Sequence, residues 1–491
     1  MNAPFNTRFA AASDPLSAVV GPDAASRASY RHAMVQAIDV ALENAHIQDG
    51  PYAGSSLDDL RRLVESIEPF PDAGLGTAAV VEDVGGAAVR HALAVSHPRA
   101  VAHLHCPVAV PALAAEALIS LTNQSLDSWD QSPFATLVEE RVVRWLAAEA
   151  GLGDAATGSF TSGASQSNMT ALHLAAERCG LAARHTGIIF TSAHAHFSIV
   201  KSARILGFAA DAVVTVDVDS EGRMRPEALA AKIERARQAG RPVVAIVATA
   251  GTTDLGAIDP LEAIAALAQR HGIFLHVDAA YGGGLLFSRH RTRLAGIEKA
   301  HSIALDFHKM LFQPISCGVL LVADEADFLP LGMKADYLNP EEAVFEGAPN
   351  LVERSFQTTR RADALKVLMT TRALGRDGLD TLICRTLENA AAAADAVSAR
   401  GHLQLARVPS LSTVVFRYVS PAGPDLADEM TNRIRARLFE AGVAALATTV
   451  LDGRVHFKLT LLNPRSTPDV VNRVLDAIED AAKDMETNNA D

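Results

Sequence analysis

Residues 276–284, HVDAAYGGG, decide how this chain is interpreted. They overlap the end of Ile273–Val277, a short apolar run of the kind that forms a buried strand. Asp278 therefore follows a predicted strand, at the end where α/β sheets gather their ligands. A lone aspartate at such a place is more often the cap of a turn, so its meaning depends on the surrounding sequence.

The chain on both sides of this stretch alternates short apolar runs with amphipathic segments. Strands are predicted at Gly187–Phe190, Ala212–Val216, Val243–Ala248, Ile273–Val277, Ser302–Leu305 and Gly318–Val322. Helices are predicted between and before them, at Gly163–Cys179, Ser198–Leu206, Pro226–Gln238 and Pro260–Arg270. This alternation is typical of βαβ units, which build a mostly parallel sheet covered by helices on both faces.

The two ends of the chain differ from this central pattern. The N-terminal part predicts helices at Ala25–Asn44, Ser56–Ile67, Pro111–Asn123 and Pro133–Ala150. The C-terminal part predicts helices at Leu387–Arg400, Met430–Ala441 and Thr467–Asp484, with strands at Ser412–Tyr418 and Val455–Leu461. We therefore expect an N-terminal helical segment (1–105), a large cofactor-binding α/β domain (106–375) and a small C-terminal domain (376–491).

Composition excludes several classes of function. The chain has 491 residues and a formal net charge of −13, and a nucleic-acid phosphate backbone requires a basic surface. Its four cysteines are scattered without metal-type spacing, which indicates reduced thiols and no metal centre. Neither a convincing signal peptide nor an apolar run of membrane-spanning length is present in the sequence. We therefore expect a cytoplasmic protein that acts on a small molecule, with no nucleic acid and no membrane as partner.

A second chemical signal is DFHK, Asp306–Lys309, which follows the predicted strand Ser302–Leu305. The apolar residues MLF come next, so a solvated surface charge explains the lysine poorly. A lysine aimed into a partly buried pocket can form a Schiff base with an aldehyde. An aspartate opposite a pyridine nitrogen keeps that nitrogen protonated, so that the ring can accept electrons. Asp278 and Lys309 are weak signals separately, but together they predict such a cofactor on Lys309.

A third stretch is GSFTSGASQSN, Gly158–Asn168, at the start of a predicted helix. Small residues let backbone N–H groups approach a phosphate, and a helix N-terminus favours negative charge. Simple helix capping by Ser162 or Ser165 is the alternative. The stretch is neither a P-loop nor a dinucleotide fingerprint, so one phosphate fits better than a nucleotide.

Two more stretches follow predicted strands. In TSAHAHFSIVKSA, Thr191–Ala203, His196 could stack on a flat cofactor, although a single histidine is usually structural and His194 is a competing choice. In ATAGTTDLGAIDP, Ala248–Pro260, the threonines place hydroxyls where they can bond a ligand oxygen, with an ordinary threonine turn as the alternative.

Taken in order, SGASQSN, AHAHFS, GTTDLGAID, HVDAAYGGG and DFHK resemble the motifs of the group II pyridoxal-5′-phosphate (PLP)-dependent amino acid decarboxylases. The resemblance runs from about His97 to the end. It implies PLP fold-type I, an aspartate aminotransferase-like α/β architecture with a smaller α+β C-terminal domain. It also implies a homodimer with active sites at the subunit interface, and release of CO2 from an L-amino acid to leave the amine.

The resemblance also assigns roles to individual residues. Lys309 would carry the cofactor, Asp278 would pair with the pyridine nitrogen, and His196 would stack on the ring. The remaining cofactor contacts would be Gly163, Ala164, Ser165 and His308 at the phosphate, Thr253 near the ring substituents and Ala280 on the other ring face. The substrate side would be lined by His105, Cys106, Asp306, Arg360 and Lys458.

Within the family, HPRAVAHLHCPVAVPALAAE, DSWDQSP, DFHKMLFQPISC and PNLVERSFQTTRRADALK most resemble the L-2,4-diaminobutyrate decarboxylase branch. Glutamate and aromatic decarboxylases usually carry Asn-Pro-His-Lys at the lysine, and the extra carboxylate of Asp306 would suit a diamino substrate if it faces the pocket. The expected product is 1,3-diaminopropane. Decarboxylation of glutamate, aspartate, ornithine or an aromatic amino acid stays open. So do an aldehyde-forming enzyme, an aminotransferase and a non-catalytic PLP-binding protein.

Two positions depart from the family pattern. Many relatives use a loop tyrosine to protonate the carbon from which CO2 has left, but no tyrosine lies between Tyr337 and Arg360, and Phe345 is near the expected place. His105 or His196 would then be the acid. The arginine expected at the substrate carboxylate aligns with Lys458, which can pair only as a point charge.

Overall fold

The computed structural model describes residues 15–45, 50–333, 347–421 and 423–488. Its centre is a seven-stranded sheet of order β1-β7-β6-β5-β4-β2-β3. The strands are β1 (Thr157–Thr161), β2 (Ile188–Ser192), β3 (Val213–Val216), β4 (Val243–Thr249), β5 (Phe274–Asp278), β6 (Ser302–Asp306) and β7 (Gly318–Val322). The run from β6 to β3 is parallel, whereas β7 is antiparallel to both its neighbours.

Helices cover both faces of this sheet, which explains why most of its strands are largely apolar. One face packs on α7 (Ala164–Cys179) and α9 (Ser198–Ile205). The other face packs on α6 (Pro133–Glu149), α10 (Pro226–Gln238) and α11 (Leu261–His271). A short helix, α8 (Ala183–Thr186), precedes β2.

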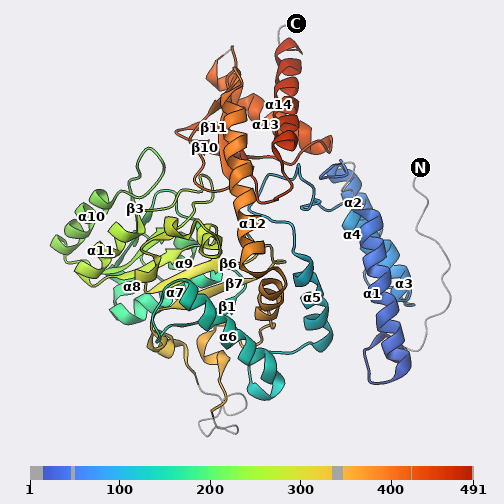
Figure 1. Cartoon of the computed structure of the whole chain (residues 1–491), viewed down its shortest axis with the longest axis horizontal. Coiled ribbons are helices and arrows are strands. Elements are labelled where there is room, and N and C mark those ends of the chain that lie inside the picture. The colour runs from blue at the N-terminus through green and yellow to red at the C-terminus, as the bar shows by residue number, and fades with distance from the viewer. Residues whose placement is uncertain (1–14, 46–49, 334–346, 422, 489–491) are drawn as a thin grey trace.

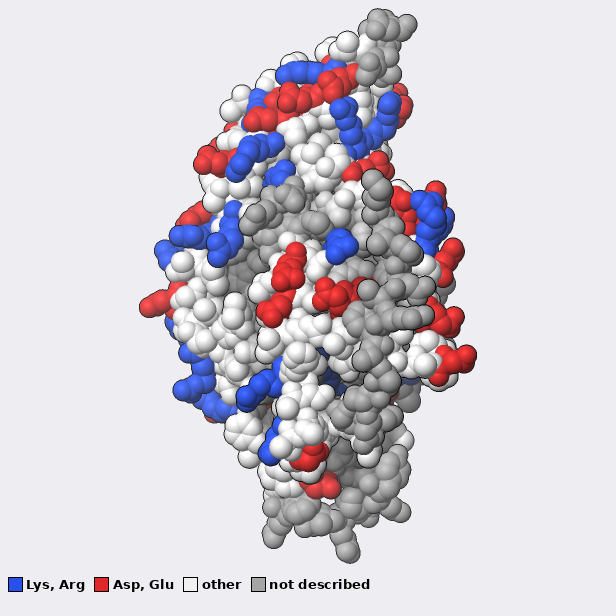
Figure 2. All heavy atoms as spheres, turned by 90° about the vertical axis from the view of Figure 1, so that its right-hand side faces the viewer, with Lys and Arg blue, Asp and Glu red and all other residues white. Residues whose placement is uncertain are grey.

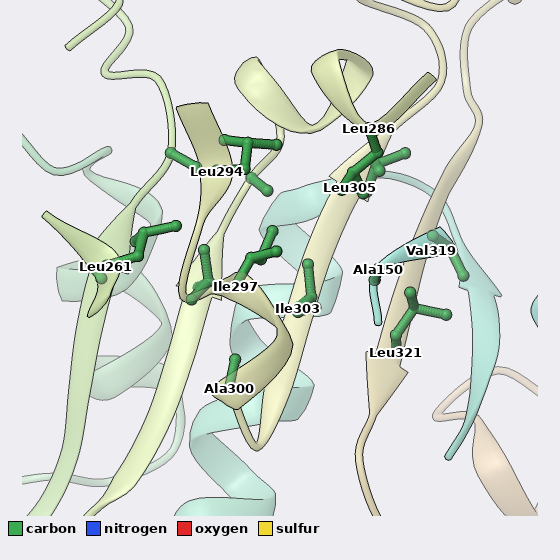
Figure 3. Close-up of a cluster of buried hydrophobic side chains, with 14 of the residues drawn as sticks. Ala150, Leu261, Leu286, Leu294, Ile297, Ala300, Ile303, Leu305, Val319 and Leu321 are labelled. Carbon is green, nitrogen blue, oxygen red and sulfur yellow. The ribbon is translucent and has the colours of Figure 1, made fainter. Parts of the chain in front are cut away.

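Strands β6 and β7 show how successive side chains divide between the two faces. Ile303 and Leu305 of β6 lie in the same cluster as Leu321 of β7 (Figure 3). The residue before Leu321, Leu320, points the opposite way and packs with Leu174 of α7. Because alternate residues of a strand point to opposite faces, both neighbours are buried and the strand has no polar side.

A smaller unit follows, built on an antiparallel sheet of order β10-β11-β9-β8. Its strands are β8 (Leu403–Leu405), β9 (Thr413–Tyr418), β10 (Ala447–Leu451) and β11 (Arg454–Thr460), and its helices are α13 (Pro424–Glu440) and α14 (Pro468–Asn488). Helix α12 (Ala364–Ser398) joins it to the large sheet, since α12 contacts α5 (Val110–Thr122) and α6 as well as β9 and α14 (Figure 1). The helix is interrupted at Gly375, whose φ of 65° suits glycine.

The N-terminal helices form a group at the side of the molecule (blue in Figure 1). They are α1 (Ala24–Asn44), α2 (Leu57–Glu65), α3 (Thr77–Val80) and α4 (Gly86–Arg90). Helix α1 packs on α3, on α4 and on the turn Val81–Gly85 between them. Across the described ranges, none of the helices has both the length and the apolar composition that crossing a membrane requires.

The predicted fold class is confirmed: the large sheet is mostly parallel and a smaller unit follows it. The predicted elements differ from the structure in two main places. Thr157–Thr161, where no strand was predicted, forms strand β1 beside β7. Helix α12 begins at Ala364, more than twenty residues before the predicted Leu387. The division at residues 105 and 375 stays an interpretation.

Candidate active site

A pocket of about 250 Å³ lies where the segments after β1, β2, β4, β5 and β6 meet. These strands run in the same direction, so their carboxyl ends share one edge of the sheet. The lining residues are Ser162, Gly163, Ala164, Ser165, His196, Thr249, Gly251, Thr253, Asp278, Ala280, Tyr281, Asp306, His308 and Lys309. Every residue predicted to hold the cofactor is therefore found in this lining, together with Asp306.

The Asp278 carboxylate is buried, and donors on two sides fix its orientation. Its Oδ1 accepts a hydrogen bond from the backbone N–H of Ala280, at 3.1 Å. Its Oδ2 accepts one from the side-chain amide of Asn168, at 2.9 Å. The second donor was not predicted as a site residue, although Asn168 lies within the quoted motif SGASQSN. Asp278 therefore has a set orientation at the end of β5.

His276 extends this arrangement into the sheet. Its Nε2 lies 2.8 Å from Asn168 Oδ1, and its Nδ1 lies 2.8 Å from Ser302 Oγ. The Asn168 amide oxygen can only accept, so Nε2 carries the proton and Nδ1 accepts from the serine. Burial lowers the pKa of His276 to about 4, which keeps the ring neutral. His276 was not predicted, although its spacing of two from Asp278 in a strand places both side chains on one face.

His196 is attached to the same arrangement through Ser198. His196 Nδ1 lies 2.8 Å from Ser198 Oγ, and Asn168 donates from its amide nitrogen to that oxygen at 3.0 Å. Burial lowers the pKa of His196, while the charge of Asp278 opposes that shift. We call Asn168, His196, Ser198, His276, Asp278 and Ser302 the buried network. It is assembled from helix α7, the segment after β2, and strands β5 and β6 themselves.

Asp306 links the lysine to the start of helix α7. Its Oδ2 lies 3.0 Å from Lys309 Nζ, and its Oδ1 accepts from the backbone N–H of Ala164 at 2.7 Å. The side chain of Asp306 is only 4% exposed, whereas that of Lys309 is 19% exposed and reaches the pocket. The carboxylate therefore faces the helix N-terminus and the lysine.

The small residues at the start of α7 have a steric reason. Gly163 has a φ of 139°, and a Cβ there would lie 3.2 Å from the His308 ring. A Cβ on the neighbouring Gly318 would lie 2.6 Å from Gly163 Cα. The His308 ring is held in turn, because its Nδ1 lies 2.9 Å from the backbone oxygen of Cys317. The loop can come this close to β7 only because both positions are glycine.

The residues predicted on the substrate side are more scattered. Cys106 is buried, and its thiol donates to the backbone oxygen of His308 at 3.5 Å. His105 is half-buried, close enough to His308 for the two charges to interact. Lys458 lies outside the lining and forms an ion pair with Asp254, at 2.7 Å.

Arg360 has a different environment from the one expected. Its guanidinium lies 2.8 Å from the carboxylate of Glu139, and both side chains are almost fully buried. The same group approaches the backbone oxygen of Phe160 at 3.4 Å. Arg360 is absent from the pocket lining and joins the segment before α12 to α6 and β1.

The segment between Tyr337 and Arg360, where many relatives have a tyrosine, lies partly outside the described residues. Tyr337 and Phe345 both fall there. Within the described part of the chain, no group of three or more histidine, cysteine, aspartate or glutamate side chains is arranged to hold a metal ion.

With this geometry in place, similarity to known proteins identifies the family. A family model described as the pyridoxal-dependent decarboxylase conserved domain matches residues 62–419. The chain belongs to the pyridoxal-dependent decarboxylase family. The chain is 64% identical to an L-2,4-diaminobutyrate decarboxylase of Rhizobium meliloti (strain 1021) over 488 residues, 99% of each chain. It is 37% identical to an L-2,4-diaminobutyrate decarboxylase of Acinetobacter baumannii over 478 residues, 92% of each.

Solved structures agree with this membership. One is the glutamate decarboxylase domain of a diaminobutyrate-pyruvate transaminase and L-2,4-diaminobutyrate decarboxylase from Vibrio parahaemolyticus. It superimposes with a TM-score of 0.86 at 34% identity, over 95% of this chain and 98% of that chain. This pyridoxal-dependent decarboxylase is thus a PLP-dependent carboxy-lyase of fold-type I.

The pocket of this decarboxylase offers groups suited to PLP. An amine, Lys309 Nζ, and a carboxylate with a set orientation, Asp278, both line it. The hydroxyl of Thr249 lines it as well, and this buried oxygen has no hydrogen-bond partner among the described residues. A buried polar atom facing a cavity normally has a partner when the site is filled. The donor set therefore fits an aldehyde-bearing, phosphorylated pyridine.

Proposed function

We propose that this enzyme decarboxylates L-2,4-diaminobutyrate to 1,3-diaminopropane. The observation that carries the proposal is its similarity, along the full length of both chains, to the Rhizobium meliloti enzyme of that name. The Acinetobacter baumannii relative with the same name adds support at lower identity. Family membership alone does not choose the substrate, because one fold serves many amino acids.

The proposed roles follow from the contacts of the pocket. Lys309 Nζ would hold the cofactor, and Asp278 would face its ring nitrogen. The donors from Asn168 and Ala280 hold that carboxylate in one orientation, in which it would accept a hydrogen bond from a protonated ring nitrogen. His196 would lie against the ring, kept in place by Ser198. When bound, PLP supplies the sink for the electron pair released as the carboxylate leaves.

The phosphate would lie at the N-terminus of α7. Ser165 lies in the first turn of that helix, where backbone N–H groups point outward and negative charge is favoured, whereas the Ala164 N–H donates to Asp306. His308 lies beside Gly163, and its Nε2 can donate in the tautomer whose Nδ1 accepts from the Cys317 backbone N–H, at 3.2 Å. Thr253 and Ala280 complete the lining on the ring side.

Two side chains, Asp306 and His196, have roles in positioning or proton transfer in the proposed mechanism. Asp306 Oδ2 lies 3.0 Å from Lys309 Nζ and can accept a hydrogen bond from it, which holds that nitrogen in place. A proton must also reach the substrate carbon after CO2 has left. Of the two histidines proposed for this step, His196 lines the pocket and His105 does not. We therefore favour His196 as the acid.

We also propose a homodimer. Three large apolar side chains of α1 are exposed, at one- and two-turn spacing: Val35, Ile38 and Leu42. Helix α5 exposes Val110 and Leu113 in the same way. Figure 2 shows the side on which the N-terminal helices lie, where charges of both signs surround broad uncharged areas. Exposed apolar surface of this kind is typical of an interface. Sedimentation of the holoenzyme tests this, and a monomer at micromolar concentration would contradict it.

We also propose a cytoplasmic location. All four cysteines are free, and three of them are buried. Free thiols are retained in reducing compartments. Fractionation of cells producing the tagged protein tests it, and recovery from an extracytoplasmic fraction would contradict it.

An amino acid panel tests the substrate. The holoenzyme is incubated with 2,4-diaminobutyrate, ornithine, glutamate, aspartate and aromatic amino acids, and the products are identified by mass. We expect the highest kcat/KM with 2,4-diaminobutyrate, with 1,3-diaminopropane and CO2 in equal amounts. A higher kcat/KM for another amino acid would refute the substrate. Aldehyde with peroxide, or a keto acid, would refute the reaction type.

A further inference from the structure

An ion pair beside the pocket connects the two sheets of the molecule. Lys458 lies in β11 of the small sheet, opposite Val415 of β9 and Ala447 of β10. Asp254 follows β4 of the large sheet and is the next residue after Thr253, which lines the pocket. Lys458 Nζ and Asp254 Oδ1 are 2.7 Å apart. We call Asp254 and Lys458 the bridging pair.

The surroundings place the bridging pair along one side of the pocket. Burial lowers the pKa of His196, and Asp278, Asp306 and Asp254 are close enough to oppose that shift. Burial also lowers the pKa of His103, with Lys458 adding to the effect, and His103 in turn interacts with His105. Asp254 itself is outside the pocket lining and lies at its margin, directly after the lining residue Thr253.

The three aspartates whose charges act on His196 are not equally available to a ligand. Asp278 accepts at both oxygens from Asn168 and Ala280. Asp306 likewise uses both oxygens, on Ala164 and Lys309, and is almost fully buried. Asp254 is 44% exposed, and its hydrogen bond is to the flexible ammonium group of a lysine. The carboxylate that can exchange its partner is therefore Asp254, not Asp306.

We propose that Asp254 binds the side-chain ammonium of the substrate and so selects a diamino acid. In the structure, the ammonium of Lys458 stands where that group would bind. A diamino acid brings both an ammonium and a carboxylate, so it can replace each charge of the bridging pair with one of its own. Lys458 is then free to turn toward the substrate carboxylate. This inference rests on the proposed function, because it assumes a substrate with a second ammonium group.

The first test compares two substrates that differ only at the distal end, 2,4-diaminobutyrate and 2-aminobutyrate. The holoenzyme variants are Asp254→Asn and, as a matched control, Asp452→Asn. Asp452 is a surface carboxylate 92% exposed, and its positive φ is one that asparagine tolerates. We expect Asp254→Asn to lower kcat/KM for 2,4-diaminobutyrate by about 10- to 100-fold and to leave that for 2-aminobutyrate nearly unchanged. Asp452→Asn should change neither.

The outcomes separate the inference from the function on which it rests. Wild-type enzyme that does not turn over 2,4-diaminobutyrate would refute the proposed function. If the wild-type enzyme is active and Asp254→Asn keeps the wild-type ratio of kcat/KM for the two substrates, the inference alone is refuted. An equal loss for both substrates would refute it as well, since that would indicate a general structural role.

A binding measurement tests the inference without relying on turnover. It uses two variants, so that the result does not depend on one of them folding. Calorimetry of the holoenzyme compares 1,3-diaminopropane with propylamine, which lacks the second ammonium. In Lys458→Gln the competing ammonium is gone, so we expect tighter binding of 1,3-diaminopropane. In Asp254→Asn we expect the two amines to bind alike. Equal or weaker binding of 1,3-diaminopropane to Lys458→Gln would contradict the exchange.

Discussion

The buried network and the bridging pair hold their charges in opposite ways. In the network, Asp278 has a donor on each oxygen and His276 a partner on each ring nitrogen. In the bridging pair, half-exposed Asp254 is bonded to the end of one flexible lysine. Groups that must hold a cofactor gain from such preorganisation, whereas groups that must exchange ligands need replaceable partners. The difference separates a site for a resident cofactor from a site for a passing substrate.

The largest expected effect comes from removing the lysine beside the network. Lys309→Ala should lose turnover by on the order of 10³-fold or more, because both the anchor and a proton carrier disappear. The absorbance band of the lysine-bound cofactor should disappear with it. Steady-state assays and absorbance spectra measure the two effects. Retained steady-state turnover would contradict the role of Lys309 as the anchor of the cofactor.

Neutralising the network carboxylate should have the next largest effect. Asp278→Asn should fold and bind cofactor, yet lose on the order of 10²- to 10³-fold in kcat, because a neutral amide cannot keep the ring nitrogen protonated. Single-turnover kinetics measures the chemical step, and the thermal midpoint checks folding. Normal turnover would mean that Asp278 only caps its turn.

The network also predicts a pH dependence of stability. His276 has a pKa of about 4 when folded and near 6.5 in an unfolded chain, so the unfolded state binds more protons between these values. Stability should therefore fall as pH drops from 6.5 to 4, by about 3 kcal/mol from this residue. Thermal midpoints of the wild type and His276→Gln across this range measure it, with exposed His185→Gln as control. Equal slopes for wild type and His276→Gln would contradict the prediction.

The smallest effect is expected at Cys106. Burial raises the pKa of its thiol to about 12, and the thiol only donates to the His308 backbone oxygen. Cys106→Ser should thus change kcat/KM by less than about threefold, since a hydroxyl can make the same bond. Alkylation of the native enzyme should label exposed Cys179 first. A loss of tenfold or more in kcat/KM would give the thiol a direct role.

Sequence patterns predicted the parallel strands because strands buried on both faces are apolar throughout. They missed β1, since Thr157–Thr161 has small and polar residues and no apolar run. The small residue there is needed: a Cβ on Gly158 would lie 2.3 Å from the Leu320 backbone oxygen. This packing requirement comes from β7, more than 150 residues away, and leaves no local pattern.

The prediction of the site was limited in the same way, because contacts from distant segments leave no local sequence pattern. Asp278 and Lys309 were predictable because each follows an apolar strand at the ligand-binding edge. The support from Asn168 could not be predicted in detail, since its partners come from two other segments, Ser198 at the start of α9 and His276 and Asp278 in β5. Arg360 was assigned to the substrate side, but it pairs with Glu139, which lies far away in the sequence. Asp306 was predicted to suit a diamino substrate if it faces the pocket; it lines the pocket, and its two oxygens contact Ala164 and Lys309.

The central claim is that Lys309 anchors the cofactor in this pocket. Borohydride reduction of the holoenzyme, followed by proteolysis and peptide mass spectrometry, tests it directly because reduction makes the lysine–cofactor bond permanent. The account predicts a phosphopyridoxyl group on the peptide that contains Lys309, with the other lysines unmodified. A phosphopyridoxyl group on a different lysine, or none on enzyme that shows full activity, would contradict it.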